Sequence, residues 1–268
     1  MSGSRTAVQE AGGACAANAL AALDVQNLTW AVGGAAIVTD VSFTVADGDF
    51  VGLIGPNGAG KTSLLNLLSG LVRASAGSIL LHGRRIDRDS PQRRAAAGLG
   101  RTFQSSTVFP ALTVLENVRL AAQARLGGSL RLWRRANRVE AALRAARECL
   151  QSVGLAERAA LPAGVLSHGD KRKLELALLL AARPSVFLLD EPMAGVSAED
   201  VPQLTGLIGR VCRERRATVI MVEHHMNVVL ALADRLAVMH HGRLLAYAAP
   251  ADVMADDTVQ AAYIGEAL

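Results

Sequence analysis

Hydrophobic and polar residues alternate along residues 35–45, AAIVTDVSFTV, and this period of two predicts a strand with one buried face. Residues 48–55, GDFVGLIG, are more uniformly apolar and predict a shorter, fully buried strand. The next segment, KTSLLNLLSGLV, carries leucines at helical spacing: Leu64, Leu65, Leu67, Leu68 and Leu71. The pattern therefore predicts a strand, a glycine-rich turn and a helix in direct succession.

Three later apolar runs predict further buried strands, at residues 185–190, 217–223 and 235–240. Segments with helical spacing lie between these runs. Strands that alternate with helices indicate a largely parallel sheet with helices on both of its faces. The fold class predicted from the pattern is therefore α/β.

Strand patterns stop between residues 105 and 165. Two helical segments occupy this region, TVLENVRLAAQARL and RVEAALRAARECLQSVGL, and an arginine-rich segment, RLGGSLRLWRRANR, separates them. We interpret the region as a helical subdomain inserted into the α/β core. Residues 1–22 lack a continuous apolar block, so they make a poor signal peptide, and we expect a loosely ordered N-terminal tail there.

Composition adds few constraints. The chain has 268 residues and a formal net charge of +4, which permits a nucleic-acid or membrane-surface partner without requiring one. The cysteines Cys15, Cys149 and Cys212 are widely spaced, which fits a reducing compartment and no cysteine metal site. No apolar run reaches the roughly 18 residues that a membrane-spanning helix needs.

The segment GPNGAGKTS, residues 55–63, matches the phosphate-binding pattern G-x-x-x-x-G-K-[ST]. In such a loop the backbone N–H groups and the start of the following helix surround phosphate oxygens. The predicted nucleotide-binding residues are Gly55, Pro56, Asn57, Gly58, Ala59, Gly60, Lys61, Thr62 and Ser63. The pattern assigns the Lys61 ammonium to the β- and γ-phosphates and the Thr62 hydroxyl to Mg²⁺. A glycine-rich turn with a chance lysine, or a dinucleotide-binding loop, are the alternatives.

Two adjacent carboxylates follow the apolar run of residues 185–190. Asp190 ends the predicted strand, where its carboxylate is a candidate Mg²⁺ ligand beside the phosphate loop. Glu191 is placed to polarise a water molecule for attack on the γ-phosphate. A solvated pair of charges at a strand end is the alternative explanation.

With these motifs in order, the sequence resembles the ATP-binding subunits of ABC transporters from about residue 23 to residue 268. The resemblance implies a P-loop NTPase core, with N-terminal antiparallel strands beside a mostly parallel sheet, and ATP and Mg²⁺ as cofactors. GRTFQ resembles the family's Q-loop, which implies that Gln104 contacts Mg²⁺ and the attacking water. VEHHM resembles the family's switch segment, which implies that His224 contacts the γ-phosphate.

LSHGD, residues 166–170, stands in the place of the family's LSGGQ signature. The resemblance implies that two ATPase subunits, identical or related, pair head to tail, so that each ATP lies between one phosphate loop and the other subunit's signature. Ser167 and the Gly169 N–H would then contact the partner's ATP, at a helix N-terminus that favours anions. An ordinary N-cap by Ser167 is the alternative, and the two are compatible.

Several positions depart from the family pattern. His168 and Asp170 replace a glycine and the glutamine of the signature, and Ser197 stands where the D-loop following Asp190 and Glu191 usually has an aspartate. His225 replaces the common aspartate after the switch histidine. Val32 stands where many members stack an aromatic side chain on adenine, and Trp30 lies two residues away. None of these positions is one of the predicted catalytic or metal-binding residues, so we expect hydrolysis to be retained.

Three segments resemble the ATPases of branched-chain amino-acid importers and their urea and amide relatives: GLGRTFQSSTVFPALTVLENV, LSHGDKRKLELA and the C-terminal ADVMADDTVQAAYIGEAL, within a short C-terminal extension at about residues 249–268. This implies two membrane permease subunits and, indirectly, a periplasmic solute-binding protein as partners. It places the chain at the cytoplasmic face of the inner membrane, without nucleic acid. The alternatives are a lipopolysaccharide-type export ATPase, a soluble ABC ATPase that acts on DNA or ribosomes, and a nucleotide-binding regulator without turnover.

The residues just after Gln104 are candidates for the permease docking groove, namely Phe109, Pro110 and Leu112. Packing within the helical subdomain is an equally good explanation for them. Arginines surround Trp133 at positions 125, 131, 134, 135 and 138, and they could touch anionic lipid headgroups. A solvated loop is the favoured interpretation of that cluster.

Overall fold

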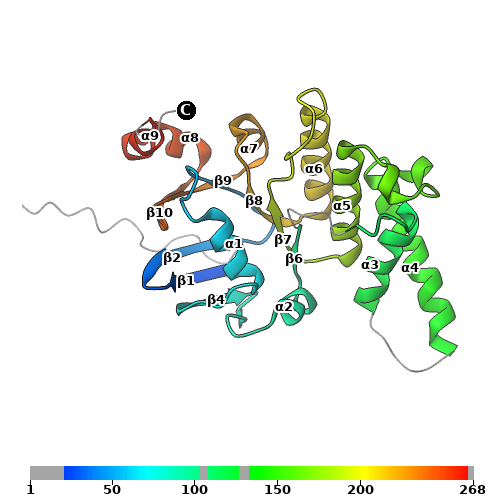
Figure 1. Ribbon diagram of the computed structural model, residues 1–268. Coiled ribbons are helices and arrows are strands. Elements are labelled where there is room, and N and C mark those ends of the chain that lie inside the picture. Colours follow the sequence, from blue (N-terminus) through cyan, green and yellow to red (C-terminus); the bar gives the residue numbers. More distant parts are fainter. Residues whose placement is uncertain (1–20, 103–107, 127–132, 265–268) are drawn as a thin grey trace, which may run out of the picture.

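The computed structural model describes residues 21–102, 108–126 and 133–264, and two β-sheets form the centre of this part (Figure 1). The smaller sheet is antiparallel, with the strand order β2-β1-β4-β5. Its strands are β1 (Ala21–Val32), β2 (Ala35–Ala46), β4 (Ala76–Leu81) and β5 (Arg84–Arg85). β2 confirms the predicted half-buried strand, with alternate side chains buried from Val41 to Val45. β1 takes in the last two residues of the predicted tail, and residues 1–20 lie outside the described part.

The larger sheet has the strand order β10-β9-β3-β8-β7-β6. Its strands are β3 (Phe50–Ile54), β6 (Leu99–Arg101), β7 (Val186–Asp190), β8 (Thr218–Val222), β9 (Arg235–His240) and β10 (Arg243–Ala248). Every pairing is parallel except that of β10 with β9. The four predicted core strands are confirmed as β3, β7, β8 and β9, whereas β6 and β10 were not predicted.

Both faces of the larger sheet are covered, which explains its continuous apolar runs. On β7, Phe187 and Leu189 point into a core shared with α5 (His168–Ala182), α6 (Val201–Arg215) and α7 (Met226–Leu232). The intervening Val186 and Leu188 join a second core with α1 (Lys61–Ser69) and the antiparallel sheet. The parallel strands therefore lie between α5, α6 and α7 on one face and α1 with the antiparallel sheet on the other (Figure 1).

The helix α1 confirms the predicted helix but is shorter than expected. Its leucines at positions 64, 65, 67 and 68 are fully buried. Burial of each such side chain contributes roughly 1.5–3 kcal/mol to the free energy of folding. The helix ends at Gly70, which adopts a left-handed conformation, and Leu71 lies beyond it with half of its surface exposed. The inclusion of Leu71 among the residues of this helix was therefore wrong. Arg94 of α2 (Pro91–Ala97) occupies the space at this end, donating to the carbonyl oxygens of Leu67 and Leu68.

Helices are the main elements in the described part of residues 105–165. The two predicted helices are confirmed as α3 (Val114–Leu126) and α4 (Trp133–Ser152), and two short 3₁₀ turns follow at Ala156–Arg158 and Ala163–Val165. α4 begins inside the arginine-rich segment, whose residues 127–132 lie outside the described part. α3 and α4 pack against α5 and against one another, on the side of the molecule away from β1 and β2 (Figure 1). The boundaries predicted for the subdomain stay a prediction.

The C-terminal residues form two short helices, α8 (Pro250–Ala255) and α9 (Asp257–Ile264), within the predicted extension. Across residues 21–102, 108–126 and 133–264, no helix combines the length and the apolar character that would let it cross a membrane.

Candidate active site

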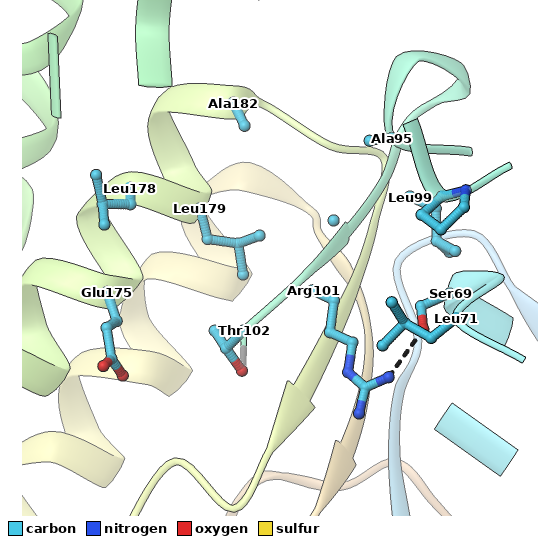
Figure 2. A pocket seen from close by; sticks show the side chains of 12 residues that line it. Ser69, Leu71, Ala95, Leu99, Arg101, Thr102, Glu175, Leu178, Leu179 and Ala182 are labelled. Atoms are coloured by element: carbon cyan, nitrogen blue, oxygen red, sulfur yellow. Dashed lines mark hydrogen bonds between the residues drawn. The ribbon is translucent and has the colours of Figure 1, made fainter. Parts of the chain in front are cut away.

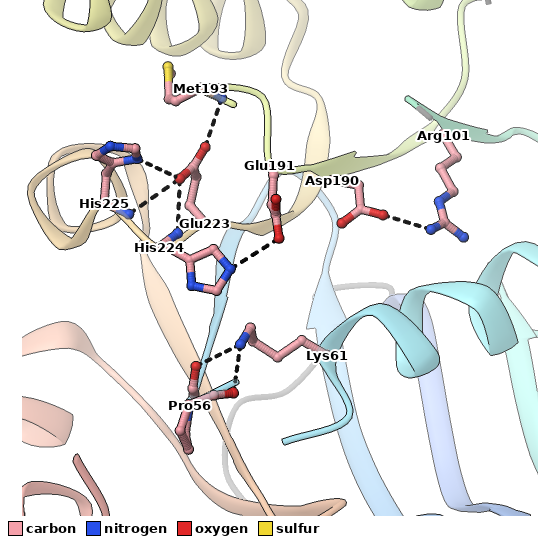
Figure 3. A network of polar contacts seen from close by, with 10 residues as sticks. Pro56, Lys61, Arg101, Asp190, Glu191, Met193, Glu223, His224 and His225 are labelled. Atoms are coloured by element: carbon pink, nitrogen blue, oxygen red, sulfur yellow. Dashed lines mark hydrogen bonds and ion pairs between the residues drawn. The ribbon is translucent and has the colours of Figure 1, made fainter. Parts of the chain in front are cut away.

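Three of the predicted catalytic residues, Lys61, Glu191 and His224, lie at one edge of the parallel sheet, because the carboxyl ends of its parallel strands meet there. The phosphate loop follows β3, and Asp190 ends β7, with Glu191 directly after it. His224 follows β8, which pairs with both β3 and β7. Figure 3 shows side chains from all three segments together. Gln104, the remaining predicted catalytic residue, lies outside the described residues.

Backbone geometry explains the glycines of the phosphate loop. Gly55, Gly58 and Gly60 have φ angles of 148°, 80° and 97°, which other residues rarely adopt. A Cβ atom on Gly55 would lie 2.2 Å from the Met239 carbonyl oxygen, so the position has no room for a side chain. The loop is anchored to the β9–β10 turn, where the Gly242 N–H donates to the Ala59 carbonyl at 3.0 Å. The middle of the loop, Asn57 and Gly58, is exposed.

The loop leads directly into α1, whose first turn contains no acidic side chain and whose N-cap, Gly60, offers no side-chain cap. The start of this helix is therefore an electropositive site for an anion. Thr62 is exposed and Ser63 half-buried in this first turn. Lys61 is buried, and its Nζ donates to the carbonyl oxygens of Gly55 and Pro56 at 2.7 and 2.9 Å. Burial lowers the pKa of the Lys61 ammonium, and the Glu191 carboxylate opposes that shift.

Asp190 is held by an arginine that the sequence analysis did not single out. Its Oδ2 accepts from Nη2 of Arg101 at 2.7 Å, with both side chains buried. Arg101 also donates to Asn66 and Ser69 on α1, at 2.7 and 2.8 Å. The other carboxylate oxygen, Oδ1, is buried and has no hydrogen-bond partner within the described part of the chain. The arginine thus connects the end of β7 to the helix that begins at the phosphate loop.

Glu191 adopts a left-handed backbone conformation with a φ of 48°, directly after β7. Such strain in a non-glycine residue is held by its surroundings and is typical of functional sites. The Glu191 N–H donates to the Val222 carbonyl at 2.9 Å. Its side chain turns toward His224, with 3.0 Å between Oε1 and Nε2 (Figure 3). The structure therefore brings Glu191 and His224 together in direct contact.

The signature residues lie at the start of α5. The Ser167 hydroxyl accepts from the Asp170 N–H at 3.2 Å and donates to the Asp170 carboxylate at 3.0 Å, so the predicted N-cap is confirmed. Asp170 is buried and pairs with Arg158 and Lys173. Ser167 and His168 are exposed, and Gly169 is half-buried. This end of the helix therefore faces outward from the chain.

The other departures from the family pattern also have definite environments. Ser197 donates to Asp200 Oδ2 at 2.7 Å, next to the start of α6. Val32 is 53% exposed at the end of β1, whereas Trp30 is partly buried against the core beneath the antiparallel sheet. His225 is exposed and contacts the buried Glu223 carboxylate through Nδ1. Glu223 was missed at the sequence level, although a carboxylate directly after a buried strand was a signal for it.

Comparisons with known proteins show to which family the chain belongs. The ABC transporter family matches residues 38–194. The branched-chain amino acid transport ATP-binding proteins LivG of Salmonella typhimurium and BraF of Pseudomonas aeruginosa are 35% and 36% identical over 252 and 253 residues, which cover 91% of this chain and 98% of each relative. The lipopolysaccharide export ATP-binding protein LptB of Escherichia coli is 33% identical over 247 residues, 92% of this chain and 98% of that protein.

Solved structures with the same architecture include a nucleotide-free ATP-binding cassette of an ABC transporter, with a TM-score of 0.78 and 27% identity, covering 92% of this chain and all of that one. The ADP conformation of the cassette MJ1267 has a TM-score of 0.77 and 28% identity, covering 92% of this chain and 99% of that one. The chain belongs to the ABC transporter family and is one of its ATP-binding, ATP-hydrolysing subunits.

Proposed function

We propose that this chain energises an importer for branched-chain amino acids or related small solutes such as urea, amides or organic acids. The observation that carries the proposal is its similarity, over nearly the full length, to LivG and BraF, both named for branched-chain amino acid transport. ATP-driven pairing of two ATPase subunits, identical or related, would supply the work. The chain would act at the cytoplasmic face of the inner membrane.

In this proposal the phosphate loop and the start of α1 hold the triphosphate. Lys61 exchanges its two loop carbonyl partners for β- and γ-phosphate oxygens. The Glu191 carboxylate accepts hydrogen bonding from the attacking water and raises its nucleophilicity. His224, already in contact with Glu191, contacts the γ-phosphate and fixes the carboxylate's direction. Gln104 is assigned to the attacking water and the metal by resemblance alone.

The donor set also suits Mg²⁺. Asp190 has a buried oxygen without a hydrogen-bond partner in the described chain, and carboxylate and hydroxyl oxygens are the ligands that Mg²⁺ prefers. Asp190, the Thr62 hydroxyl and Gln104 are the residues that would hold it. Bound there, Mg²⁺ would neutralise part of the phosphate charge. Arg101 would keep the Asp190 carboxylate oriented from its other oxygen.

The exposed start of α5 supports the two-subunit arrangement. Ser167 and Gly169 lie at a helix N-terminus that is accessible from outside the chain, where they can contact ATP bound to a second subunit. The same arrangement leaves the phosphate loop of this chain to be completed by the partner's signature. Each site would then hydrolyse ATP only when the two subunits are together.

A cavity of about 250 Å³ is a candidate surface for a membrane permease. It lies between the end of α1, α2, β6 and α5, and Leu71, Arg101 and Leu179 are among its lining residues (Figure 2). Arg101, which holds Asp190, also lines this cavity, so a permease bound here would lie next to a residue that contacts the proposed metal ligand. Phe109 and Pro110 are exposed and Leu112 is half-buried, but none of the three lines this cavity. A periplasmic solute-binding protein would act through the permeases alone.

An export ATPase is the second candidate, because LptB shares 33% identity over nearly the same span. Uptake measurements in a strain that lacks this gene separate the two. The importer proposal expects reduced uptake of radiolabelled leucine, isoleucine, valine or urea, restored by the wild-type chain and not by Lys61→Ala. Normal uptake of all four solutes, together with loss of lipopolysaccharide from the cell surface, would favour export instead.

A further inference from the structure

Glu223 is a buried carboxylate with no role in the mechanism proposed above. It follows β8 directly, and only 2% of its side-chain surface is exposed. An ionised carboxylate in such a place is costly unless hydrogen-bond donors surround it. The donors around Glu223 therefore indicate what this residue does.

Both carboxylate oxygens of Glu223 accept hydrogen bonds, and they accept them from two separate loops. Oε1 accepts from the Met193 N–H at 2.8 Å, in the loop that follows Glu191. Oε2 accepts from the N–H groups of His224 and His225 at 2.9 and 3.3 Å, and it lies 3.1 Å from Nδ1 of His225. Figure 3 shows this one side chain between the two loops.

The contacts of Glu223 connect the two loops that carry the residues assigned to catalysis. Glu191 lies two residues before Met193 and is held with a φ of 48°. His224 lies one residue after Glu223, and its ring contacts Glu191 at 3.0 Å. We propose that Glu223 is a positioning residue, which fixes the loops after β7 and β8 relative to each other so that Glu191 and His224 meet. The inference rests on the roles proposed above for Glu191 and His224.

Glutamine cannot replace Glu223 in this setting, although it has the same shape. Only the carboxylate accepts at both ends, whereas a glutamine amide has one oxygen and one NH₂ donor. Whichever way the amide turns, its NH₂ group faces a backbone N–H of one loop. Glu223→Gln should therefore release either the Met193 segment or the histidine segment, without creating a cavity.

Hydrogen exchange measured by mass spectrometry tests the contacts in the full chain. We expect Glu223→Gln to speed exchange about tenfold or more in a peptide that covers residues 191–197, in one that covers residues 222–228, or in both, because hydrogen bonds to charged groups are strong. Thr218→Val is the matched control, because Thr218 is a buried acceptor of the Gly48 N–H at the opposite end of β8. Unchanged exchange in both peptides of Glu223→Gln would overturn the proposal.

Turnover and nucleotide binding test the consequence. We expect Glu223→Gln to lower kcat roughly 10- to 100-fold, as misplacement of catalytic groups does, while the Kd for ATP changes less than about threefold. In a His224→Ala background the same substitution should have little further effect on kcat, because each change already disrupts the contact between Glu191 and His224. Equal losses of kcat in both backgrounds would mean that Glu223 acts independently of His224, and would overturn the proposal.

The kinetic test also separates this inference from the function it rests on. If Glu191→Gln and His224→Ala both turned over like wild type, the catalytic assignments would fail, and the positioning role would fail with them. If those two variants lost turnover as expected while Glu223→Gln kept the wild-type kcat, only the positioning role would fail.

Discussion

The two regions that carry motif residues, the carboxyl edge of the parallel sheet and the start of α5, are built differently. At the sheet edge Lys61, Asp190 and Glu223 are buried and bonded to other groups of the same chain. At the start of α5, Ser167 and His168 are exposed. Residues that act on a nucleotide bound to their own chain can be preorganised by buried contacts, whereas a surface that serves a partner must stay open. The difference is what the two-subunit proposal requires.

The largest effect should come from the sheet edge, and it should change the rate of hydrolysis without changing ATP binding. We expect Glu191→Gln to lower kcat by roughly 10²- to 10⁴-fold, because the amide cannot act as a base toward water. ATP binding should remain, so the variant should accumulate as an ATP-bound dimer in size-exclusion chromatography. Phosphate release and elution volume at saturating ATP are the measurements, with the exposed Glu214→Gln as the control. A variant that hydrolyses ATP like wild type would remove Glu191 from the mechanism.

The second prediction compares one ion pair from each region. Arg101→Met should lower the free energy of unfolding by about 3–5 kcal/mol, because it leaves the Asp190 carboxylate buried without its cation. Arg158→Met should cost less than about 1 kcal/mol, since half of the Arg158 side chain is exposed and Asp170 keeps Lys173. Urea unfolding of both variants measures the difference. Equal losses would contradict the distinction between a preorganised and an open region.

A third prediction concerns the phosphate loop. Lys61→Ala should weaken ATP binding roughly 10- to 100-fold, because a charged hydrogen-bond donor to phosphate contributes about 1.5–3 kcal/mol. Titration calorimetry with ATP is the measurement. Arg93→Ala, at an exposed position of α2, is the control and should bind ATP like wild type. Unchanged affinity in Lys61→Ala would overturn the assignment of this loop to phosphate.

Local patterns predicted the core strands, because strands buried on both faces have continuous apolar runs. They also predicted the glycine-rich loop before α1, because its glycines follow a fixed sequence pattern. The end of α1 was predicted wrongly, although Gly70 is the kind of residue that ends a helix in a left-handed conformation. Periodicity suggested that the helix continued as far as Leu71. The buried Arg94, which lies against Gly70, instead takes the space at the end of the helix.

Contacts between distant segments could not be predicted from the sequence. Arg101 and Asp190 are 89 residues apart, and Glu223 and Met193 are 30 residues apart. Each pair meets because the parallel strands β6, β7 and β8 lie side by side, and the strand order was not fixed by the pattern alone. The sequence therefore allowed chemical roles to be proposed for motif residues, but it did not indicate the residues that hold them in place.

The smallest effect should come from the start of α5, and a comparison of two N-cap serines can measure it. Ser167 caps α5 at the signature, and Ser90 caps α2 away from it. Replacing either by alanine should cost about 1 kcal/mol of stability, because one backbone N–H at each helix start loses its acceptor. Only Ser167→Ala should also weaken ATP-dependent pairing, measured by analytical ultracentrifugation in the Glu191→Gln background, since only this hydroxyl is proposed to face a partner's ATP. If both serines reduced pairing equally, the effect would follow from stability, and the start of α5 would have no distinct role at the partner's nucleotide.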